Sequence, residues 1–354
     1  MKACSHASIP EVSRLFMIER LPPDPRMIAL PAELRNAIAQ ALDRVPAIRW
    51  MTAARTLSEQ YRALDDIGAA PAVRTHLDAL GYAALFMPAT YAQLYGAMKA
   101  AAERIPSWSP ETMLDMGSGP GTALWAATVC WPSLRDLTAW EREPVLIALG
   151  RNFAHTSANP ALRSVRWVQR TLQAPIERGI RFDLVVLGHV LGEIPPDERS
   201  AIVETAWRLS RGMLLIVEPG TSVGFAVVRA ARDLLLANGA ATIAPCTHDQ
   251  PCPLTNDWCH FPQRLRRPEF QRRARGASSP WEDAKYSYAA LTRFPPERPV
   301  WGRVIREPTF NKAYAEVLIS SRDGILRHRA LKRDRDAFKW VKHLEWGQTL
   351  EEQP

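Results

Sequence analysis

The segment "LDMGSGPGT" places an acid, Asp115, two residues before the first of three glycines, Gly117, Gly119 and Gly121. Glycine is needed where a backbone turns tightly and approaches a ligand, because it has no Cβ. A helix is predicted directly after the loop, and its first N–H groups favour a negative ligand group. The spacing differs from Gly-x-Gly-x-x-Gly and from a lysine-ended phosphate loop. A cofactor loop of another kind is therefore predicted.

This loop resembles the first motif of Rossmann-like S-adenosylmethionine-dependent methyltransferases. The resemblance implies that Asp115 and the loop, including Ser118, hold the methionine moiety of S-adenosylmethionine. It also implies that an acid at the end of the second strand holds the ribose hydroxyls. Glu141 ends the predicted strand "LTAWE" and stands at that place.

The segment "GHVLGE" follows the predicted fourth strand, at the carboxyl edge where ligands bind in such sheets. It lacks the Asn/Asp-Pro-Pro-aromatic motif of amine methylation, and it has no cysteine for carbon-5 pyrimidine methylation. His189 and Glu193 are the candidates there for steering a substrate proton. The alternative is that they only shape the loop, so the sequence assigns no catalytic base.

Three cysteines, Cys246, Cys252 and Cys259, lie close together in "CTHDQPCPLTNDWCHF" with His248 and His260. Turn-rich loops of this type let thiolates converge on one metal ion or cluster. Zinc would accept three cysteines and one histidine, whereas an iron–sulfur cluster would normally take four cysteines. Free cysteines in a loop are the alternative.

Basic residues concentrate late in the chain, which carries a formal net charge of +8. From residue 241 onward, 20 Lys and Arg stand against 14 Asp and Glu. The densest patch, "QRLRRPEFQRRAR", holds six arginines and one glutamate. Arginine matches phosphate oxygens bidentately, so this patch predicts RNA binding, with a solvated surface as the alternative. The six are Arg264, Arg266, Arg267, Arg272, Arg273 and Arg275.

The elements that must position these residues follow from hydrophobic periodicity. Residues 28–105 have helical spacing, and from about residue 111 predicted strands alternate with predicted helices. This alternation predicts a doubly wound parallel sheet. After residue 245 the pattern changes to antiparallel strands, with Asp323-Gly324 at a hairpin turn. We expect these strands to interleave with the main sheet, because its last strands must come from this part.

Composition narrows the class of protein. The 354 residues are 47% hydrophobic and 23% charged, which is typical of a soluble globular protein. No uncharged apolar run reaches membrane-spanning length. Five cysteines, odd in number and clustered, argue against a secreted disulfide framework, so a cytoplasmic location is expected.

Four segments carry a resemblance to one family: "LDMGSGPGTALWA", "VEPGTSVGF", "PCTHDQPCPLTNDWCHF" and "WEDAKYSYAAL". Together they resemble the methyltransferase-like proteins of small ribosomal subunit assembly, found in mitochondria with bacterial relatives. The resemblance runs over residues 28–347. It implies a methyltransferase domain, association with small-subunit rRNA, and a [4Fe-4S] cluster held by four cysteines. Three of the four cysteines of the family correspond to Cys246, Cys252 and Cys259. Ser320 stands near the position of the fourth, so His248, His260 or Ser320 would complete the site.

These inferences predict an α/β protein with a Rossmann-like methyltransferase sheet, a helical N-terminal region and a Cys-rich, Arg-rich C-terminal insertion. The expected parts are a loose extension (1–27, in which Met27 is a possible start), a helical region (28–108), the core (109–245) and an interleaved C-terminal part (246–354). The expected protein is a monomer that acts on small-subunit rRNA with S-adenosylmethionine. The alternative is a catalytically inactive rRNA-binding assembly factor that keeps the fold and a structural metal site.

Overall fold

The computed structural model describes residues 27–62, 73–177 and 179–354. The loose extension expected for residues 1–27 therefore lies, except for Met27, outside the described residues. None of the helices in the described ranges is long and apolar enough to cross a lipid bilayer.

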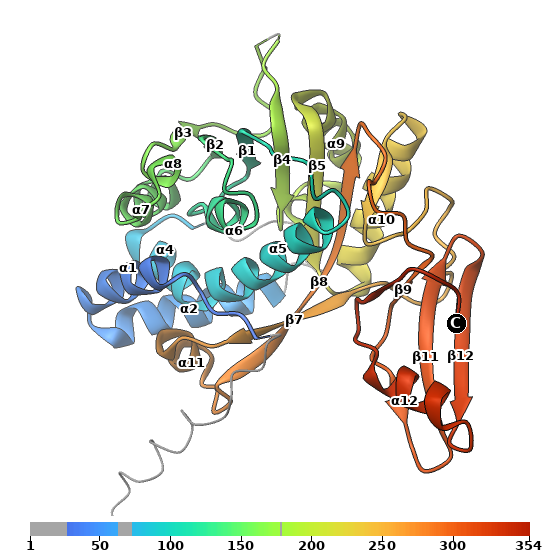
Figure 1. The fold of residues 1–354 in the computed structure, drawn as a ribbon. Helices are drawn as coiled ribbons and strands as arrows, with labels where there is room; N and C mark the ends of the chain where they lie inside the picture. The colour runs from blue at the N-terminus through green and yellow to red at the C-terminus, as the bar shows by residue number, and fades with distance from the viewer. Residues whose placement is uncertain (1–26, 63–72, 178) are drawn as a thin grey trace, which may run out of the picture.

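The largest element is an eight-stranded sheet (Figure 1). Its strands are β1 (Thr112–Met116), β2 (Asp136–Glu141), β3 (Arg166–Gln169), β4 (Phe182–Gly188), β5 (Ser210–Pro219), β6 (Ala241–Ala244), β7 (Phe261–Arg266) and β8 (Trp281–Thr292). Their order is β3-β2-β1-β4-β5-β8-β6, and β7 also pairs with β8. Neighbours from β3 to β5 are parallel, while β8 is antiparallel to β5, β6 and β7. The predicted Rossmann-like α/β sheet is confirmed.

Both faces of this sheet are buried. In β4, Leu184 and Val186 pack into one apolar layer, and Val185 and Leu187 pack into the other. Each buried aliphatic side chain of this size contributes about 1.5–3 kcal/mol, so this continuous apolar strand fixes the middle of the sheet.

Helices cover the two faces (Figure 1). On one side lie α1 (Ala32–Asp43), α2 (Ala47–Arg62), α4 (His76–Leu85), α5 (Met87–Ala102), α6 (Thr122–Cys130), α7 (Pro144–His155) and the short α8 (Pro160–Arg163). On the other lie α9 (Pro196–Leu209) and α10 (Ser222–Ala237). The first four form the N-terminal helical region, in which Thr75 and Asp78 make a capping box that starts α4.

The predicted segment "GHVLGE" lies at the end of the fourth strand. β4 ends at its first residue, Gly188. His189 then adopts a left-handed φ of 57°, and the chain turns into the short 3₁₀ helix η3 (Leu191–Glu193). This turn directs the chain over the carboxyl edge of the sheet.

The C-terminal part contributes to two sheets. The cysteine segment, β7 and α11 (Glu269–Arg275) lie between β6 and β8 of the main sheet. A second, five-stranded sheet with α12 (Arg335–His343) follows at one end of the molecule (Figure 1). Its strands are β9 (Gly302–Val304), β10 (Thr309–Phe310), β11 (Tyr314–Ser321), β12 (Gly324–Leu331) and β13 (Thr349–Leu350). The hairpin expected at Asp323-Gly324 joins β11 to β12, where Ser321 pairs with Gly324.

Candidate functional site

The glycine loop has the tight backbone that its sequence predicts. Gly117, Gly119 and Gly121 all have positive φ angles, of 75°, 54° and 83°. A Cβ at Gly117 would lie 2.6 Å from Val190, and one at Gly121 would lie 2.9 Å from the Trp167 ring. At Gly119, by contrast, the nearest atom is the Tyr82 hydroxyl at 3.8 Å. Side chains therefore pack closely against the loop at Gly117 and Gly121, whereas the space beside Gly119 is open.

Glu141 holds this loop to the end of β2. One carboxylate oxygen accepts a hydrogen bond from the Gly119 N–H at 2.8 Å. The other accepts from the backbone N–H groups of Arg142 and Glu143, at 2.8 and 2.9 Å. Burial raises the pKa of Glu141, and these N–H groups oppose that rise. The acid predicted to hold a ribose therefore anchors the loop, and Oε2 keeps one acceptor position for a ligand.

Asp115 is a buried acid without a complete set of partners. Its side chain is only 2% exposed, and Oδ2 has no hydrogen-bond partner. Burial, followed by the nearby charge of Glu141, raises the pKa of Asp115 to about 8. Because an unpaired buried carboxyl costs free energy, a cationic or hydrogen-donating ligand group would be favoured beside it.

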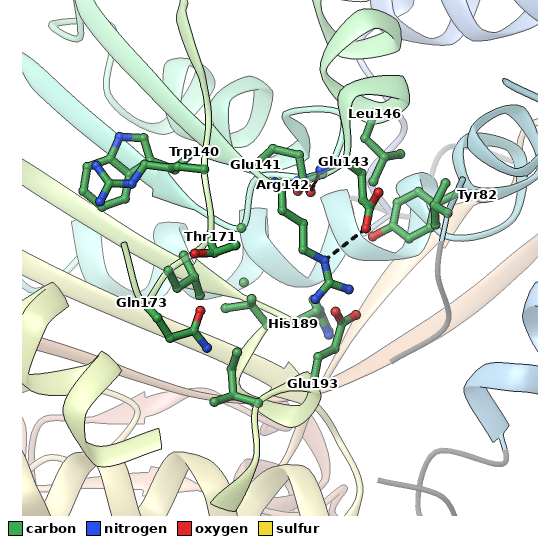
Figure 2. Close-up of a pocket in the computed structure, with 18 of the residues that line it drawn as sticks. Tyr82, Trp140, Glu141, Arg142, Glu143, Leu146, Thr171, Gln173, His189 and Glu193 are labelled. Atoms are coloured by element: carbon green, nitrogen blue, oxygen red, sulfur yellow. Dashed lines mark hydrogen bonds and ion pairs between the residues drawn. The ribbon is translucent and has the colours of Figure 1, made fainter. Parts of the chain in front are cut away.

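A cavity of about 120 Å³ lies against this loop (Figure 2). Of the predicted cofactor residues, Gly117, Gly119 and Glu141 line it, while Asp115, Ser118 and Gly121 lie behind the lining. Pockets for drug-sized ligands usually hold about 300–1,000 Å³. This cavity is smaller than that range, and the half-exposed side chain of Arg142 extends into it from the end of β2 (Figure 2).

Two tyrosines from the N-terminal helices complete the pocket, and the sequence analysis missed both. Tyr61 comes from α2 and Tyr82 from α4. The Tyr61 hydroxyl donates to Glu193 Oε1 at 3.1 Å across 132 positions of sequence. No local pattern signals such a long-range contact.

The predicted acid–base candidates both line the cavity. Burial lowers the pKa of His189 to about 4, and its buried Nε2 has no partner. Burial raises the pKa of Glu193 to about 7 despite its bond to Tyr61. A further buried acid, Glu218, accepts from the Leu191 N–H at 2.9 Å and holds η3 in place, and burial raises its pKa to about 8. Of these groups, Glu193 is matched to proton transfer near neutral pH.

The three clustered cysteines lie in a loop next to the second sheet. Burial raises the pKa of the Cys259 thiol, and the nearby Cys246 and Cys252 raise it further. Nevertheless, within the described ranges no three His, Cys, Asp or Glu side chains are gathered closely enough to hold a metal ion. The structure therefore does not support the predicted iron–sulfur or zinc site as it stands.

The three residues considered for a fourth metal ligand differ in their surroundings. His260 packs between Trp258 and Trp346, with ring centroids 5.5 and 4.9 Å away, so its role is in packing. Ser320 pairs in β11 with Arg303, whose Nε donates to the carbonyl of Pro245, next to Cys246. Both ring nitrogens of His248 are buried without a hydrogen bond of good geometry, although the Gln250 backbone lies near the ring. Of the three, His248 is therefore the one with both ring nitrogens buried and, within the described chain, without a hydrogen bond of good geometry.

The arginine patch is largely paired with carboxylates. Arg264 forms a bidentate pair with Asp283, at 2.8 and 2.9 Å. Glu282 forms ion pairs with Arg267 at 2.8 Å and with Arg275 at 3.7 Å. Arg272 forms an ion pair with Glu269 at 3.1 Å. Among the described residues only Arg266 and Arg273 of the six lack a carboxylate partner, and Arg273 lies over the Trp50 ring.

Comparison with known proteins gives a family match over most of the chain. A family model described as "Mitochondrial small ribosomal subunit Rsm22" matches residues 76–351. The human protein "Ribosome assembly protein METTL17, mitochondrial" is 29% identical over 266 residues, covering 70% of this chain and 57% of that protein. The "Rsm22-cox11 tandem protein 2, mitochondrial" of Schizosaccharomyces pombe is 24% identical over 325 residues, covering 76% of this chain and 42% of that protein. The chain spans about half the length of these curated relatives.

Among solved structures, the magnesium protoporphyrin IX methyltransferase of Synechocystis is 12% identical. The match covers 67% of this chain and 93% of that one, with a TM-score of 0.38.

The relatives correct the predicted location. Both curated relatives are named as mitochondrial proteins, so the prediction of a cytoplasmic location was wrong. The cysteine pattern argues only against a disulfide framework, and it cannot distinguish one reducing compartment from another.

The buried carboxyl of Asp115 predicts an unusual dependence of stability on pH. Its pKa is about 8 in the folded protein, against about 3.9 in an unfolded chain. The folded state therefore keeps a proton that the unfolded state loses, and the free energy of unfolding falls as pH rises through that window. The fall is at most about 1.4 kcal/mol per pH unit. In urea titrations, Asp115→Asn should remove this fall and be more stable than the wild type near pH 8.

Asp183 offers a matched control for that experiment. Its burial is outweighed by bonds to Arg211 and to the Glu111 and Thr112 backbone, which hold its pKa at about 2. Its contribution to stability is lost only as pH falls toward that value, so Asp183→Asn should destabilise the protein equally across neutral pH. Parallel pH profiles for wild type and Asp115→Asn would contradict the assignment of a protonated Asp115.

Proposed function

The chain belongs to the mitochondrial small ribosomal subunit Rsm22 family, and from this premise we propose that it binds S-adenosylmethionine and acts on or with the small-subunit rRNA. The observation that carries the proposal is the buried, unpartnered Asp115 carboxyl behind a glycine loop in a Rossmann-like methyltransferase sheet.

The residues of the pocket fit this cofactor in charge and shape. Asp115 would favour the positively charged methionine end, and the open backbone at Gly119 would let the cofactor lie against the loop. Glu141 would accept a hydrogen bond from a ribose hydroxyl at the remaining acceptor position of Oε2. When bound, the cofactor supplies an electrophilic methyl group. Glu193, with its pKa of about 7, would take the proton of the accepting group.

A second function, that of a non-catalytic assembly factor, is favoured by a separate observation. The cavity is small, with Arg142 extended into it, and the buried His189 is too weak a base to stay protonated near neutral pH. In this alternative the protein binds small-subunit rRNA as a monomer and uses the pocket only to stabilise its fold.

Cofactor binding should be measurable by calorimetry. The wild type should bind S-adenosylmethionine, and Glu141→Ala should weaken binding at least about tenfold, because losing hydrogen bonds to a charged acceptor costs about 1.5–3 kcal/mol. Binding near neutral pH should also release protons as Asp115 ionises beside the cation, and Asp115→Asn should release none. If wild-type protein produces no heat of binding, the pocket is not a cofactor site.

Methyl transfer separates the two functions. With radiolabelled S-adenosylmethionine and small-subunit rRNA, the wild type should label the RNA at a rate that rises with pH through about 7, because Glu193 must be ionised to act as a base. Glu193→Gln should slow labelling by about 10²–10⁴-fold, as expected for loss of a general base, and leave cofactor affinity nearly unchanged. A wild type that binds the cofactor without labelling RNA would establish the assembly-factor alternative.

We also propose that Cys246, Cys252 and Cys259 hold a structural iron–sulfur cluster, with zinc as the alternative. The three thiols influence one another's pKa values, and the charges of Arg232, Arg303 and Arg306 favour the thiolate forms, although the side chains would have to move together to bind a cluster. His248 is the candidate for the fourth ligand.

Anaerobically purified protein should contain iron and sulfide, or zinc, at about one site per chain. Cys252→Ser should remove the metal and lower the melting temperature, because binding energy at such a site is folding energy. His260→Gln serves as the control, since it should disturb packing without removing the metal. Metal-free wild-type protein with the same melting temperature as metal-treated protein would refute the site.

A further inference from the structure

The second sheet and α12 carry most of the excess positive charge of the chain. Residues 309–343 contain nine Lys and Arg and four Asp and Glu, a net charge of +5 out of the +8 of the whole sequence. About a tenth of the chain thus accounts for more than half of its net charge. This segment builds β10, β11, β12 and α12.

Most arginines of the arginine patch have a carboxylate partner, whereas within the described part of the chain most cations of this segment do not. Glu316 binds Arg327 and Arg329 across the β11–β12 pairing. The remaining cations near α12 have no carboxylate partner among the residues that the structure describes. They are Lys332, Arg333, Arg335, Lys339 and Lys342, all exposed. Asp334 is used as the N-cap of α12, where it accepts from the Ala337 N–H at 3.2 Å.

Exposed aromatic rings lie beside these cations. Phe310 of β10 is 56% exposed, and the Lys342 ammonium lies 5.1 Å from the centre of its ring. Trp340 of α12 is 38% exposed and makes an edge contact with His328 of β12, at 5.7 Å between ring centres. Two partly exposed rings thus lie on or beside α12, one in β10 and one next to β12.

We propose that the surface formed by β10, β12 and α12 is a binding site for single-stranded RNA, and this rests on the proposed action on rRNA. Unpaired cations can displace the counterions of phosphates, and exposed rings can stack on unpaired bases. This surface stands at one end of the molecule, away from the N-terminal helices that line the cofactor cavity (Figure 1).

The composition of the surface favours RNA over a protein partner. Three of the five unpaired cations are lysines, and lysine is depleted in protein–protein interfaces. Because Arg327 and Arg329 are both paired with Glu316, the unpaired cations near α12 are those that follow β12 and those on α12 itself.

The test is the salt dependence of binding to a single-stranded segment of small-subunit rRNA, measured by fluorescence anisotropy with the full chain. A variant with Lys332, Arg333, Lys339 and Lys342 replaced by Ala keeps the Asp334 cap. Its log–log salt slope should be flatter than that of the wild type by up to about 3 units, at about 0.7 per phosphate contact. Phe310→Ala should weaken binding at least about fivefold with an unchanged slope, because stacking involves no counterions.

Two comparators show whether the effect is local. The first replaces Arg35, Arg44, Arg49 and Arg55 of the N-terminal helical region, which are also exposed, and changes the net charge equally. The second replaces Arg266 and Arg273, the two unpaired arginines of the predicted patch. Both should flatten the slope less than the α12 variant does, by up to about 1.4 units for the second.

The possible outcomes separate the hypotheses. If the wild type does not bind rRNA, the proposed function itself fails. If the wild type binds and the α12 variant keeps its slope, this surface is not an RNA site. In that case, a variant that binds naked RNA normally but fails to associate with the assembled subunit would indicate a protein partner. If all three cation variants flatten the slope in proportion to their lost charge, only net charge matters and the proposed local site is overturned.

Discussion

Carboxyl groups buried at the carboxyl edge of the main sheet are the constraint on which the rest of the site depends. Asp115, Glu141, Glu193 and Glu218 all lie there, and burial raises the pKa of each. Buried acids cost free energy unless hydrogen bonds or cations compensate them. Backbone N–H groups compensate Glu141 and Glu218, and in return fix the glycine loop and η3. Asp115, whose Oδ2 has no partner, is the group that a ligand would have to satisfy.

Part of this site follows from sequence because its geometry is local. The acid, the three glycines and the following helix lie within one strand–loop–helix unit, so their spacing determines their positions. The position of Glu141 could also be predicted, because it ends the next strand and the carboxyl ends of neighbouring parallel strands meet at one edge of the sheet. Tyr61 and Tyr82 could not be found this way, because they reach the pocket through tertiary packing of α2 and α4.

The arginine patch shows a different limit of reasoning from sequence. Its segment contains one glutamate, so it reads as strongly basic. In the structure β7 pairs with β8, which brings Glu282 and Asp283 against these arginines. Arg267 and Glu282 are both mostly buried, with side chains 14% and 13% exposed, so this pair contributes to the fold rather than to a free surface. Strand pairing, which the local sequence does not specify, thus decides which cations remain available.

The cysteine loop lies where the two sheets meet. Arg303 of β9 donates to two backbone carbonyls. One belongs to Pro245, between β6 of the main sheet and the cysteine loop, and the other to Gly347, just before β13. Trp346 contacts His260 within the loop, and Arg306 donates to the Trp258 carbonyl. These contacts join the loop to the second sheet through backbone carbonyls, which do not depend on the order of the cysteine side chains. A ligand bound by the three thiols would therefore reinforce contacts that already hold the loop to the second sheet.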